Sequence, residues 1–373
     1  MRHLFVTNDF PPKLGGIESY LTNLCKGFDP GDIAVIAPAR AGHETVDDAM
    51  PYEIVRLPGS YLRAARSVYR PIVDAAMRFD VDAVHFLAAL PLGRLGPAVR
   101  AATGLPYTVV THGTGDVLLP ARVPFARRAL RATLVSADIV YTNSEFTRRA
   151  IEKVTKGKAR TAMLHPCVDI DRFSLAVSGA RVRSSIPSSG HFVVLFCSRM
   201  VKRKGADVLL RAIAGVEGIF GLFVGEGPER SSLEKLAREL GVEDRTSFRG
   251  LVGDDELPGY YAAADAFCMP CTDRFGGLDT EGFGVVYLEA QATGLPCIAG
   301  RCGGSAEAVE DGVSGYVVDE PQPQQLAAII DGLRRDPGLC AQLGGAGRAR
   351  VESRFAPSVA AVTLERALAA VSG

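Results

Sequence analysis

Two glutamates in the last third of the sequence have the spacing of a ligand-binding pair. Glu281 precedes the run Gly282-Phe283-Gly284, and Glu289 lies eight positions after Glu281. A helix that begins near Gly284 directs its N-terminal N–H groups at a ligand, with Glu281 in the loop ahead of it. Because a carboxylate accepts several hydrogen bonds, the pair suits the vicinal hydroxyls of a sugar or a ribose. The alternative is that Glu289 is an ordinary exposed helix residue, but a strand-like run follows and packs this helix beside a sheet.

A basic turn supplies cations that suit a diphosphate. Arg199 and Lys204 lie in the run from Cys197 to Gly205, directly after an apolar, strand-like segment. Arginine contacts a phosphate through a fork of N–H groups, whereas lysine acts as a point charge. When this run is taken alone, a solvated basic turn explains it equally well.

Two further motifs follow strand-like segments in the first half of the chain. Gly15 and Gly16 precede a helical pattern, so the backbone there can approach an anion at a helix N-terminus. His112 and Gly113 follow the apolar run Tyr107–Thr111. A tight turn explains the glycine pair about as well as a phosphate site does, and a lone histidine is more often structural than functional.

The eight cysteines give a weaker signal. Cys268 and Cys271 have the spacing of a redox motif or a zinc half-site, but the helix start and the two further zinc ligands are missing. Most of the cysteines lie in apolar runs, where Cys behaves as a small hydrophobe. We therefore expect a cytoplasmic protein with reduced thiols.

Short apolar runs that alternate with helical patterns must position these motifs. The runs are Leu4–Thr7, Ile33–Ala37, Ile54–Leu57, Ala83–Leu87, Tyr107–Thr111, Ile139–Thr142, His191–Cys197, Phe220–Val224, Thr246–Arg249, Ala266–Met269, Pro296–Ala299 and Tyr316–Val318. Such runs are typical of parallel strands that are buried on both faces. The sequence therefore predicts an α/β fold of two doubly wound, Rossmann-like domains facing a cleft at the carboxyl ends of their strands.

A lapse in the pattern predicts the boundary between the domains. From His165 to Gly190 the apolar periodicity is lost, and we interpret this stretch as a linker that opens the second domain. We expect domains at residues 1–165 and 166–355, with a C-terminal helix at 356–373 that packs back on the first. The length of 373 residues suits two domains.

Charge and hydropathy narrow the possible partners. Lys plus Arg equals Asp plus Glu at 42 each, which disfavours bulk binding to nucleic acid. No apolar run approaches the roughly 20 residues of a membrane span, and the first residues do not have the pattern of a secretory signal. The segment Pro120–Arg131, with Val123, Phe125 and Leu130 among its arginines, suits contact with an anionic membrane surface. A solvated helix face explains this composition equally well.

A second basic cluster gives the same two alternatives. Arg63, Arg66 and Arg70 have the spacing of one helix face, which predicts a basic stripe on a helix. Such a stripe can lie on an anionic lipid leaflet or simply face water.

Taken together and in order, the motifs resemble retaining glycosyltransferase family 4, which has the GT-B fold. The resemblance covers nearly the whole chain and includes the run Gly225-Glu226-Gly227-Pro228. Glu281 and Glu289 match the family's Glu-x7-Glu signature. Within the family, the runs 7–12 and 276–282 are similar to bacterial phosphatidylinositol-monomannoside mannosyltransferases.

The resemblance implies which residues hold the diphosphate of a nucleotide-sugar donor. Gly16, next to Gly15, would give its backbone N–H to a donor phosphate. Arg199 and Lys204 would bind the diphosphate and neutralise the leaving group. The run Gly282-Phe283-Gly284 would belong to the donor-binding loop.

The resemblance also implies the contacts to the sugar and the course of the reaction. Glu281 would bind hydroxyls of the transferred sugar, Glu289 the ribose diol, and His112 the sugar near its C6 hydroxyl. The acceptor would attack on the face from which the phosphate departs, and that phosphate would take the acceptor proton. No cofactor and no metal are implied, and no Asp-x-Asp motif follows a predicted strand.

The implied substrates are GDP-mannose and a phosphatidylinositol mannoside or related glycolipid, at the inner face of the cell membrane. Three alternatives remain open from the sequence. The first is a transferase of the same fold with a UDP-sugar donor and a soluble or polysaccharide acceptor. The others are a nucleotide-sugar epimerase or hydrolase, and a protein that binds a sugar nucleotide without turnover.

Overall fold

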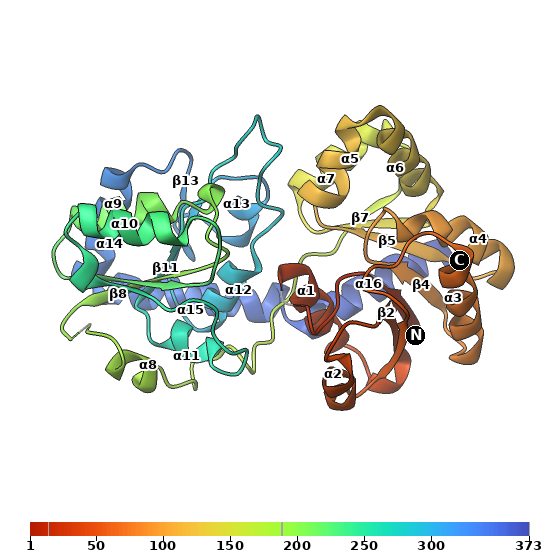
Figure 1. Ribbon diagram of the computed structural model, residues 1–373, viewed down its shortest axis with the longest axis horizontal. Coiled ribbons are helices and arrows are strands. Elements are labelled where there is room, and N and C mark those ends of the chain that lie inside the picture. Colours follow the sequence, from red (N-terminus) through yellow and green to blue (C-terminus); the bar gives the residue numbers. More distant parts are fainter. Residues whose placement is uncertain (14, 188, 373) are drawn as a thin grey trace. The chain divides into compact units, whose positions relative to one another are not determined.

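The computed structural model of the protein describes residues 1–13, 15–187 and 189–372, which form two compact units (Figure 1). Unit 1 comprises Met1–Cys167 together with Pro357–Gly373, and unit 2 comprises Val168–Ala356. Each unit is built around one parallel sheet, so each has a core of its own.

The sheet of unit 1 has seven parallel strands in the order β3-β2-β1-β4-β5-β6-β7. Their bounds are β1 (His3–Val6), β2 (Ile33–Pro38), β3 (Glu53–Leu57), β4 (Ala83–Phe86), β5 (Tyr107–Thr111), β6 (Ile139–Thr142) and β7 (Thr161–Met163). The strand order reverses between β1 and β4, and ligands of doubly wound sheets bind beside such a reversal. The loop after β1 leads to the glycine pair, with Gly15 capping the next helix and Gly16 beginning it.

Helices connect the strands of unit 1, and the last helix of the chain returns to it. They are α1 (Gly16–Cys25), α2 (His43–Ala49), α3 (Arg66–Arg78), α4 (Gly96–Thr103), α5 (Leu119–Arg122), α6 (Pro124–Ser136), α7 (Glu145–Thr155) and α16 (Pro357–Ser372), with the short turns η1 (Pro30–Asp32), η2 (Leu92–Leu95) and η3 (Thr114–Leu118). The hydroxyl of Tyr141 donates a 2.8 Å hydrogen bond to the carbonyl oxygen of Leu364 in α16. A Cβ on Gly27 would overlap the carbonyl of Pro357, so only glycine permits the close approach of α16.

The sheet of unit 2 has six parallel strands in the order β10-β9-β8-β11-β12-β13. Their bounds are β8 (Phe192–Cys197), β9 (Ile219–Val224), β10 (Thr246–Phe248), β11 (Ala266–Met269), β12 (Cys297–Gly300) and β13 (Gly315–Val318). Here the order reverses between β8 and β11, which places the basic turn after β8 beside the loop after β11.

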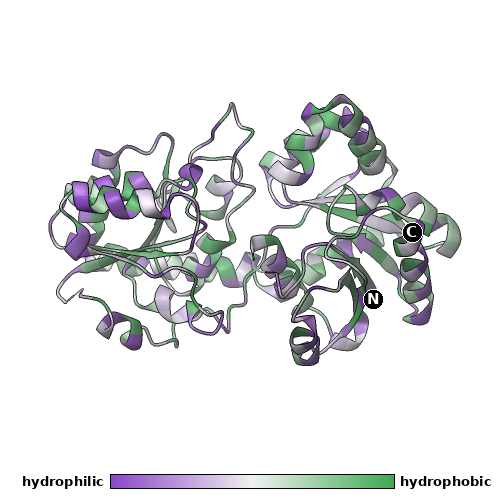
Figure 2. Ribbon diagram, in the orientation of Figure 1, coloured by the Kyte–Doolittle hydropathy of each residue, from purple (hydrophilic) through white to green (hydrophobic). Residues whose placement is uncertain are grey.

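The connections of unit 2 complete its α/β layers. They are α8 (Ala180–Ser184), α9 (Ala206–Ala214), α10 (Arg230–Glu239), α11 (Leu257–Ala262), α12 (Val285–Ala292), α13 (Ser305–Ala308), α14 (Pro323–Arg335) and α15 (Pro337–Arg354), with the turns η4 (Lys202–Lys204) and η5 (Glu243–Arg245). Figure 2 shows hydrophobic residues along the strands of both sheets and hydrophilic residues on the helices around them. Within the described residues, no helix is both long and apolar enough to cross a membrane.

The predicted α/β fold is confirmed, and each of the twelve predicted strands is present with ends shifted by at most one residue. The prediction missed β7, which has only three half-buried residues and therefore no strong apolar pattern. The stretch 165–190, interpreted as a linker that opens the second domain, belongs to unit 2 from Val168 onward. Phe173 and Val182 of this stretch lie in the core of unit 2. Isolated apolar residues in irregular backbone carry no periodicity, so the sequence pattern did not reveal them.

The two basic segments also differ in part from the prediction. Arg63 lies ahead of α3, so only Arg66 and Arg70 share a helix. Leu130 is buried in the core of unit 1 and is not part of an exposed face. By contrast, Val123 and Phe125 are exposed, and 83% of Phe125 is accessible to solvent.

Candidate functional site

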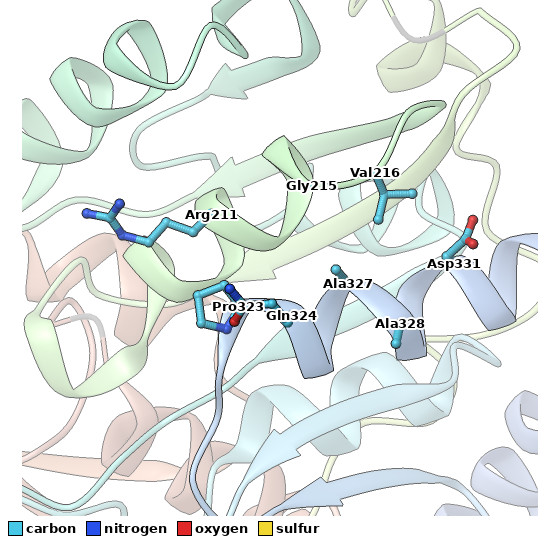
Figure 3. A pocket seen from close by; sticks show the side chains of 8 residues that line it. All are labelled: Arg211, Gly215, Val216, Pro323, Gln324, Ala327, Ala328 and Asp331. Carbon is cyan, nitrogen blue, oxygen red and sulfur yellow. The ribbon is translucent and has the colours of Figure 1, made fainter.

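A surface hollow of about 370 Å³ between α9 and α14 contains none of the predicted site residues (Figure 3). Small apolar residues line most of it, with Arg211 and Asp331 at its edges. The carboxylate of Asp331 is already paired with Arg334 and Arg335 on its own helix. The hollow therefore offers no set of converging polar groups for a ligand.

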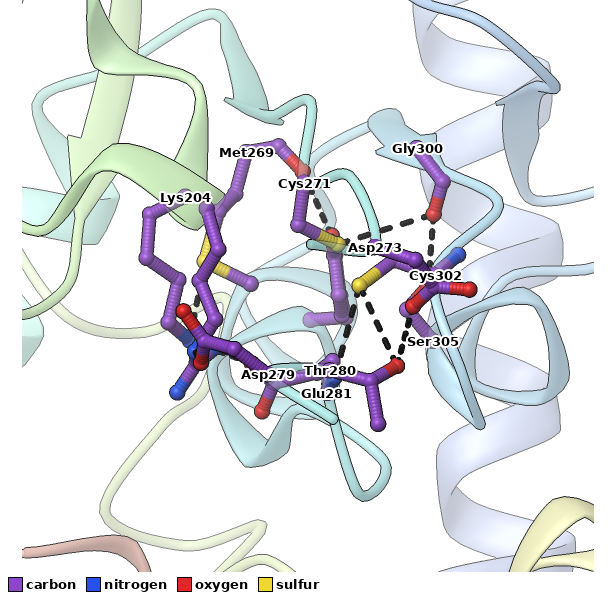
Figure 4. A network of polar contacts seen from close by, with 12 residues as sticks. Lys204, Met269, Cys271, Asp273, Asp279, Thr280, Glu281, Gly300, Cys302 and Ser305 are labelled. Carbon is purple, nitrogen blue, oxygen red and sulfur yellow. Dashed lines mark hydrogen bonds and ion pairs between the residues drawn. The ribbon is translucent and has the colours of Figure 1, made fainter. Parts of the chain in front are cut away.

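The structure brings Lys204 and Glu281 together at the strand reversal of unit 2 (Figure 4). Nζ of Lys204 lies 2.7 Å from Oε2 of Glu281, and Nη1 of Arg203 lies 2.5 Å from the same oxygen. Lys204 is 7% exposed, so this contact is shielded from water. Burial alone would raise the pKa of Glu281, but the charges of Lys204 and Arg203 outweigh it and lower that pKa. Glu281 is therefore an ionised carboxylate at neutral pH.

The loop after β12 fixes the backbone of Glu281 (Figure 4). The N–H of Glu281 donates to Sγ of Cys302 at 3.3 Å, and its carbonyl accepts from the N–H of Gly304 at 2.8 Å. Gly303 has a φ of 55°, and a Cβ there would overlap the carbonyl oxygen of Glu281. The same Cβ would lie 2.5 Å from Oγ1 of Thr280. Only glycine at this position lets the two loops meet.

Glu289 occupies a separate, buried place in α12, as the sequence predicted for a helix that begins near Gly284. Gly284 caps α12 with a φ of 94°, and a Cβ there would lie 2.7 Å from the ring of Tyr287. Oε2 of Glu289 accepts a 2.6 Å hydrogen bond from the hydroxyl of Tyr261. Burial raises the pKa of Glu289, and the hydrogen bond from Tyr261 opposes that rise. Phe283 is buried between the two glutamates along the chain.

Arg199 does not join this cluster. Its side chain is exposed, and it makes no hydrogen bond or ion pair within the part of the chain that the structure describes. Its carbonyl accepts from the N–H of Val201 at 2.9 Å, which shapes the turn after β8. The role of Arg199 as a ligand of a diphosphate stays a prediction, since a free guanidinium is available for an anion.

In unit 1, His112 is held at the end of β5. Its Nε2 lies 2.9 Å from the carbonyl oxygen of Leu87, so the proton of the neutral ring belongs on Nε2 and Nδ1 is an acceptor. Its backbone N–H donates to Oδ2 of Asp116 at 2.7 Å. Burial raises the pKa of Asp116, although His112 opposes this. The ring of Tyr20, from α1, meets His112 edge-on at 5.4 Å between centroids.

The glycine pair lies at the start of α1, as the helical pattern after it predicted, and its role as an anion site stays a prediction. Gly16 is the first residue of α1, and a Cβ there would meet nothing within 4 Å. A Cβ on Gly15 would lie 2.6 Å from Oε2 of Glu18, whose carboxylate is buried in the first turn. Nζ of Lys13 lies 2.7 Å from the other oxygen of Glu18 and neutralises it. At Gly16 the backbone is therefore open on the side where a Cβ would lie.

Sequence reasoning missed two contributors to the cluster in unit 2. Arg203 had a signal, since it stands next to Lys204 in the same basic run. Tyr261 had none, because it meets Glu289 only through the fold. The sequence predicts a backbone turn at Gly303 and Gly304, but the contact of Gly303 with Glu281 comes only from the fold. Half-buried Gly282 lies directly after Glu281, as the sequence requires.

The cysteines are free thiols, and Cys271 differs from most of the others in its hydrogen bonds and in the direction of its pKa shift. Sγ of Cys271 lies 3.4 Å from the hydroxyl of Tyr287, and a hydrogen bond with Cys302 lowers the pKa of Cys271 although burial opposes this. Among the described residues, no group of three or more His, Cys, Asp or Glu side chains is arranged to hold a metal ion.

Comparison with protein families matches both halves of the chain. Residues 14–172 match the family model described as "Glycosyltransferase Family 4", and residues 181–350 match the one described as "Glycosyl transferases group 1". A protein of Mycolicibacterium smegmatis is 38% identical over 92% of each chain, and is named GDP-mannose-dependent alpha-(1-6)-phosphatidylinositol monomannoside mannosyltransferase. The chain belongs to glycosyltransferase family 4. The expected family is therefore confirmed, and this protein is a glycosyltransferase.

A second relative agrees with this family 4 assignment, and a solved structure agrees with the fold. A protein of Corynebacterium glutamicum is 34% identical over 94% of this chain and 93% of its own, and is named GDP-mannose-dependent monoacylated alpha-(1-6)-phosphatidylinositol monomannoside mannosyltransferase. The crystal structure of HepE from Anabaena in complex with UDP has a TM-score of 0.83 and 22% identity, and covers 99% of this chain and 100% of its own. At that identity HepE supports the GT-B fold of this glycosyltransferase and nothing finer.

Proposed function

We propose that this glycosyltransferase transfers mannose from GDP-mannose to a phosphatidylinositol mannoside or a related glycolipid, with retention at the anomeric carbon. The activities in the names of two relatives, 38% and 34% identical over more than nine-tenths of the chain, support these substrates. The observation that carries the chemistry is the buried contact between Lys204 and the ionised Glu281 at the strand reversal of unit 2.

The arrangement in unit 2 suggests which of its residues bind each part of the donor. Oε2 of Glu281 already faces two cations, which leaves Oε1 to accept hydrogen bonds from hydroxyls of the sugar. Glu289, oriented by Tyr261, accepts from the ribose diol. Lys204 and the exposed Arg199 stabilise the departing diphosphate, whose developing charge is the largest in such a transfer. That phosphate takes the proton of the attacking acceptor hydroxyl, and we propose that no metal is required.

We propose that two motifs of unit 1 also contact the donor. Gly15 caps α1 and Gly16 is its first residue, and this position suits a donor phosphate because a helix start favours an anion. His112 keeps Nδ1 as a free acceptor while Nε2 contacts the carbonyl of Leu87, which suits a contact with a sugar hydroxyl.

A lipid acceptor implies contact with a membrane surface, and α5 and α6 carry the groups for it. Phe125, Val123 and Leu119 are exposed there, among the exposed arginines Arg122 and Arg127. Exposed apolar side chains next to cations are typical of segments that lie on anionic lipid. We propose that the enzyme acts as a peripheral protein at the inner face of the cell membrane.

The test is calorimetric binding of GDP-mannose and of UDP-glucose in the presence of EDTA, followed by transfer assays with phosphatidylinositol mannosides. We expect GDP-mannose alone to bind, transfer to proceed in EDTA, and the new linkage to have the α-configuration of the donor. Preference for UDP-glucose would overturn the proposed donor within the same family. Turnover of the donor without any acceptor would indicate an epimerase or a hydrolase.

A further inference from the structure

Arg203 contacts the loop after β11 at both of its ends. Its carbonyl oxygen accepts the N–H of Thr272 at 2.8 Å, where the loop begins. Its Nε lies 2.8 Å from Oδ1 of Asp279, and its Nη1 lies 2.5 Å from Oε2 of Glu281, where the loop ends. The guanidinium is a rigid fork, so the two ion pairs fix the distance between Asp279 and Glu281.

The loop between these anchors depends on them. Below its tip, Arg274 and Asp279 close the turn with two backbone hydrogen bonds of 3.0 and 3.2 Å. Phe275 lies at the tip of the turn with 69% of its surface exposed, and it and the two glycines after it have positive φ angles of 52°, 61° and 80°. A narrow, exposed hairpin of this kind has little core of its own, so attachment at its base decides its position.

The same anchors determine how Glu281 faces a ligand. Arg203 and Lys204 both contact Oε2, so the carboxylate is held by one oxygen and presents the other. Lys204 alone is a flexible point charge and does not fix the plane of the carboxylate. The side chain of Arg203 is only 22% exposed, so water screens its ion pairs weakly.

We infer that Arg203 is a positioning residue, which ties the loop 272–281 to the turn after β8 and so orients Glu281 toward the transferred sugar. This inference rests on the proposed function, in which Glu281 binds the sugar and not the nucleotide. Arg203 acts through Glu281 and need not touch the donor. Loss of Arg203 is therefore expected to impair the contacts to the sugar of the donor and to leave binding of GDP intact.

The test compares Arg203→Met and Arg203→Lys with the control Arg334→Met. Arg334 also makes two hydrogen bonds to an aspartate, at 3.0 and 2.8 Å, but on α14. In the ligand-free protein, hydrogen exchange in residues 272–281 should be faster in Arg203→Met and unchanged in the control. The kcat for GDP-mannose should fall roughly 10- to 100-fold, as expected for a misplaced contact, while the Kd for GDP stays within about threefold. Arg203→Lys should restore part of the kcat.

Two results would overturn the inference. A loss of GDP affinity in parallel with kcat would show that Arg203 binds the diphosphate itself. Unchanged exchange and unchanged kcat would show that the ion pairs position nothing. If Arg203→Met does not fold, Asp279→Asn removes one of the two ion pairs at a more exposed residue and should again speed exchange of the loop. If the wild-type protein does not bind GDP-mannose, the proposed function fails, while the exchange comparison still tests the attachment of the loop.

Discussion

The hydroxyl of Tyr261 donates a 2.6 Å hydrogen bond to Oε2 of Glu289, and both residues are buried in unit 2. Tyr261 is itself held by aromatic contacts, edge-on to Phe173 at 5.5 Å and stacked on Phe267 at 5.9 Å. The orientation of a carboxylate at the proposed ribose site is thus fixed by the hydrophobic core. Other charged or titratable groups near Glu289 are Arg172, Asp254 and Cys197.

Tyr261→Phe should weaken binding of GDP by roughly 3- to 10-fold, since one hydrogen bond to a charged group is lost. The pKa of Glu289 is already raised by burial, and the hydrogen bond from Tyr261 lowers it. Without that hydrogen bond the pKa of Glu289 rises further, so Glu289 takes up a proton at a higher pH. As the pH falls, the variant should therefore begin to lose affinity for GDP at a higher pH than the wild type does. Calorimetry at several pH values, with 2′-deoxy-GDP as the comparison ligand, measures this. Equal GDP affinity at every pH would contradict a role of Tyr261 in orienting Glu289.

Lys204→Ala should reduce turnover on the order of 10²-fold, because a cation at the leaving group acts mainly in the transition state. The matched control is Lys202→Ala, since Lys202 belongs to the same short turn but is exposed. The control should keep turnover within about twofold, as exposed charges contribute little. Steady-state assays with GDP-mannose provide the comparison. Similar losses in both variants would argue for a general effect of positive charge in the turn.

Gly303→Ala should reduce mannose transfer at least about 10-fold, because its Cβ would push the carbonyl of Glu281 and displace the loop. The variant should also be less stable by about 1–3 kcal/mol, since φ is positive and the space is filled. Gly312→Ala is the matched control. Gly312 has a φ of 72° but nothing within 4 Å of its Cβ position. Its replacement therefore measures the loss of stability that comes from the positive φ alone. Transfer that survives in both variants would show that the contact with Glu281 is dispensable.

Two buried histidines in unit 1 predict a loss of stability in acid. Nδ1 of His3 lies 3.0 Å from Nε2 of His85, and Nδ1 of His85 lies 2.7 Å from Oγ1 of Thr108. Burial lowers the pKa of both rings; for His3 the nearby Glu365 opposes this, with smaller effects of the N-terminal amine and Asp82.

Below about pH 6.5 the histidines of the unfolded chain bind protons, whereas His3 and His85 in the folded protein stay neutral. The free energy of unfolding should therefore fall as the pH decreases below about 6.5. The slope can reach about 1.4 kcal/mol per pH unit for each histidine. Urea unfolding at pH 7.5, 6.5 and 5.5 measures it. His85→Gln keeps polar groups but cannot titrate, and should flatten the slope. His191→Gln replaces a less enclosed histidine and should leave the slope unchanged. Equal slopes in the wild type and both variants would contradict the role of the two buried histidines.

The exposed face of α5 and α6 should bind vesicles that contain anionic phospholipid. Arg127→Glu combined with Arg128→Glu should lower vesicle binding several-fold, because both cations are exposed next to Phe125. Lys153→Glu combined with Lys158→Glu makes the same change in charge at exposed residues of unit 1 and serves as the control. Sedimentation with vesicles, and GDP calorimetry to confirm an intact donor site, test this. Equal binding by both double variants would remove this face as the membrane contact.

Much of the fold could be predicted from local pattern. Most strands of both sheets are short runs of apolar residues, as expected for parallel strands that are buried on both faces. The start of α12 was also predictable, because the glycine-rich run ahead of Glu289 permits the positive φ at Gly284. The edge strand β7 was not predictable, since its half-buried residues follow no apolar pattern.

The sequence by itself determined the two α/β units, the family, and the short segments that carry Lys204, Glu281 and Glu289. These are local properties, set by periodicity and by motifs within a few residues. Only the tertiary structure decided that Arg203 and Lys204 share one oxygen of Glu281, that Tyr261 orients Glu289, and that Arg199 stays apart. The reason is physical: these contacts join residues up to about eighty positions apart, and the order of the strands, not the spacing along the chain, brings them within hydrogen-bond distance.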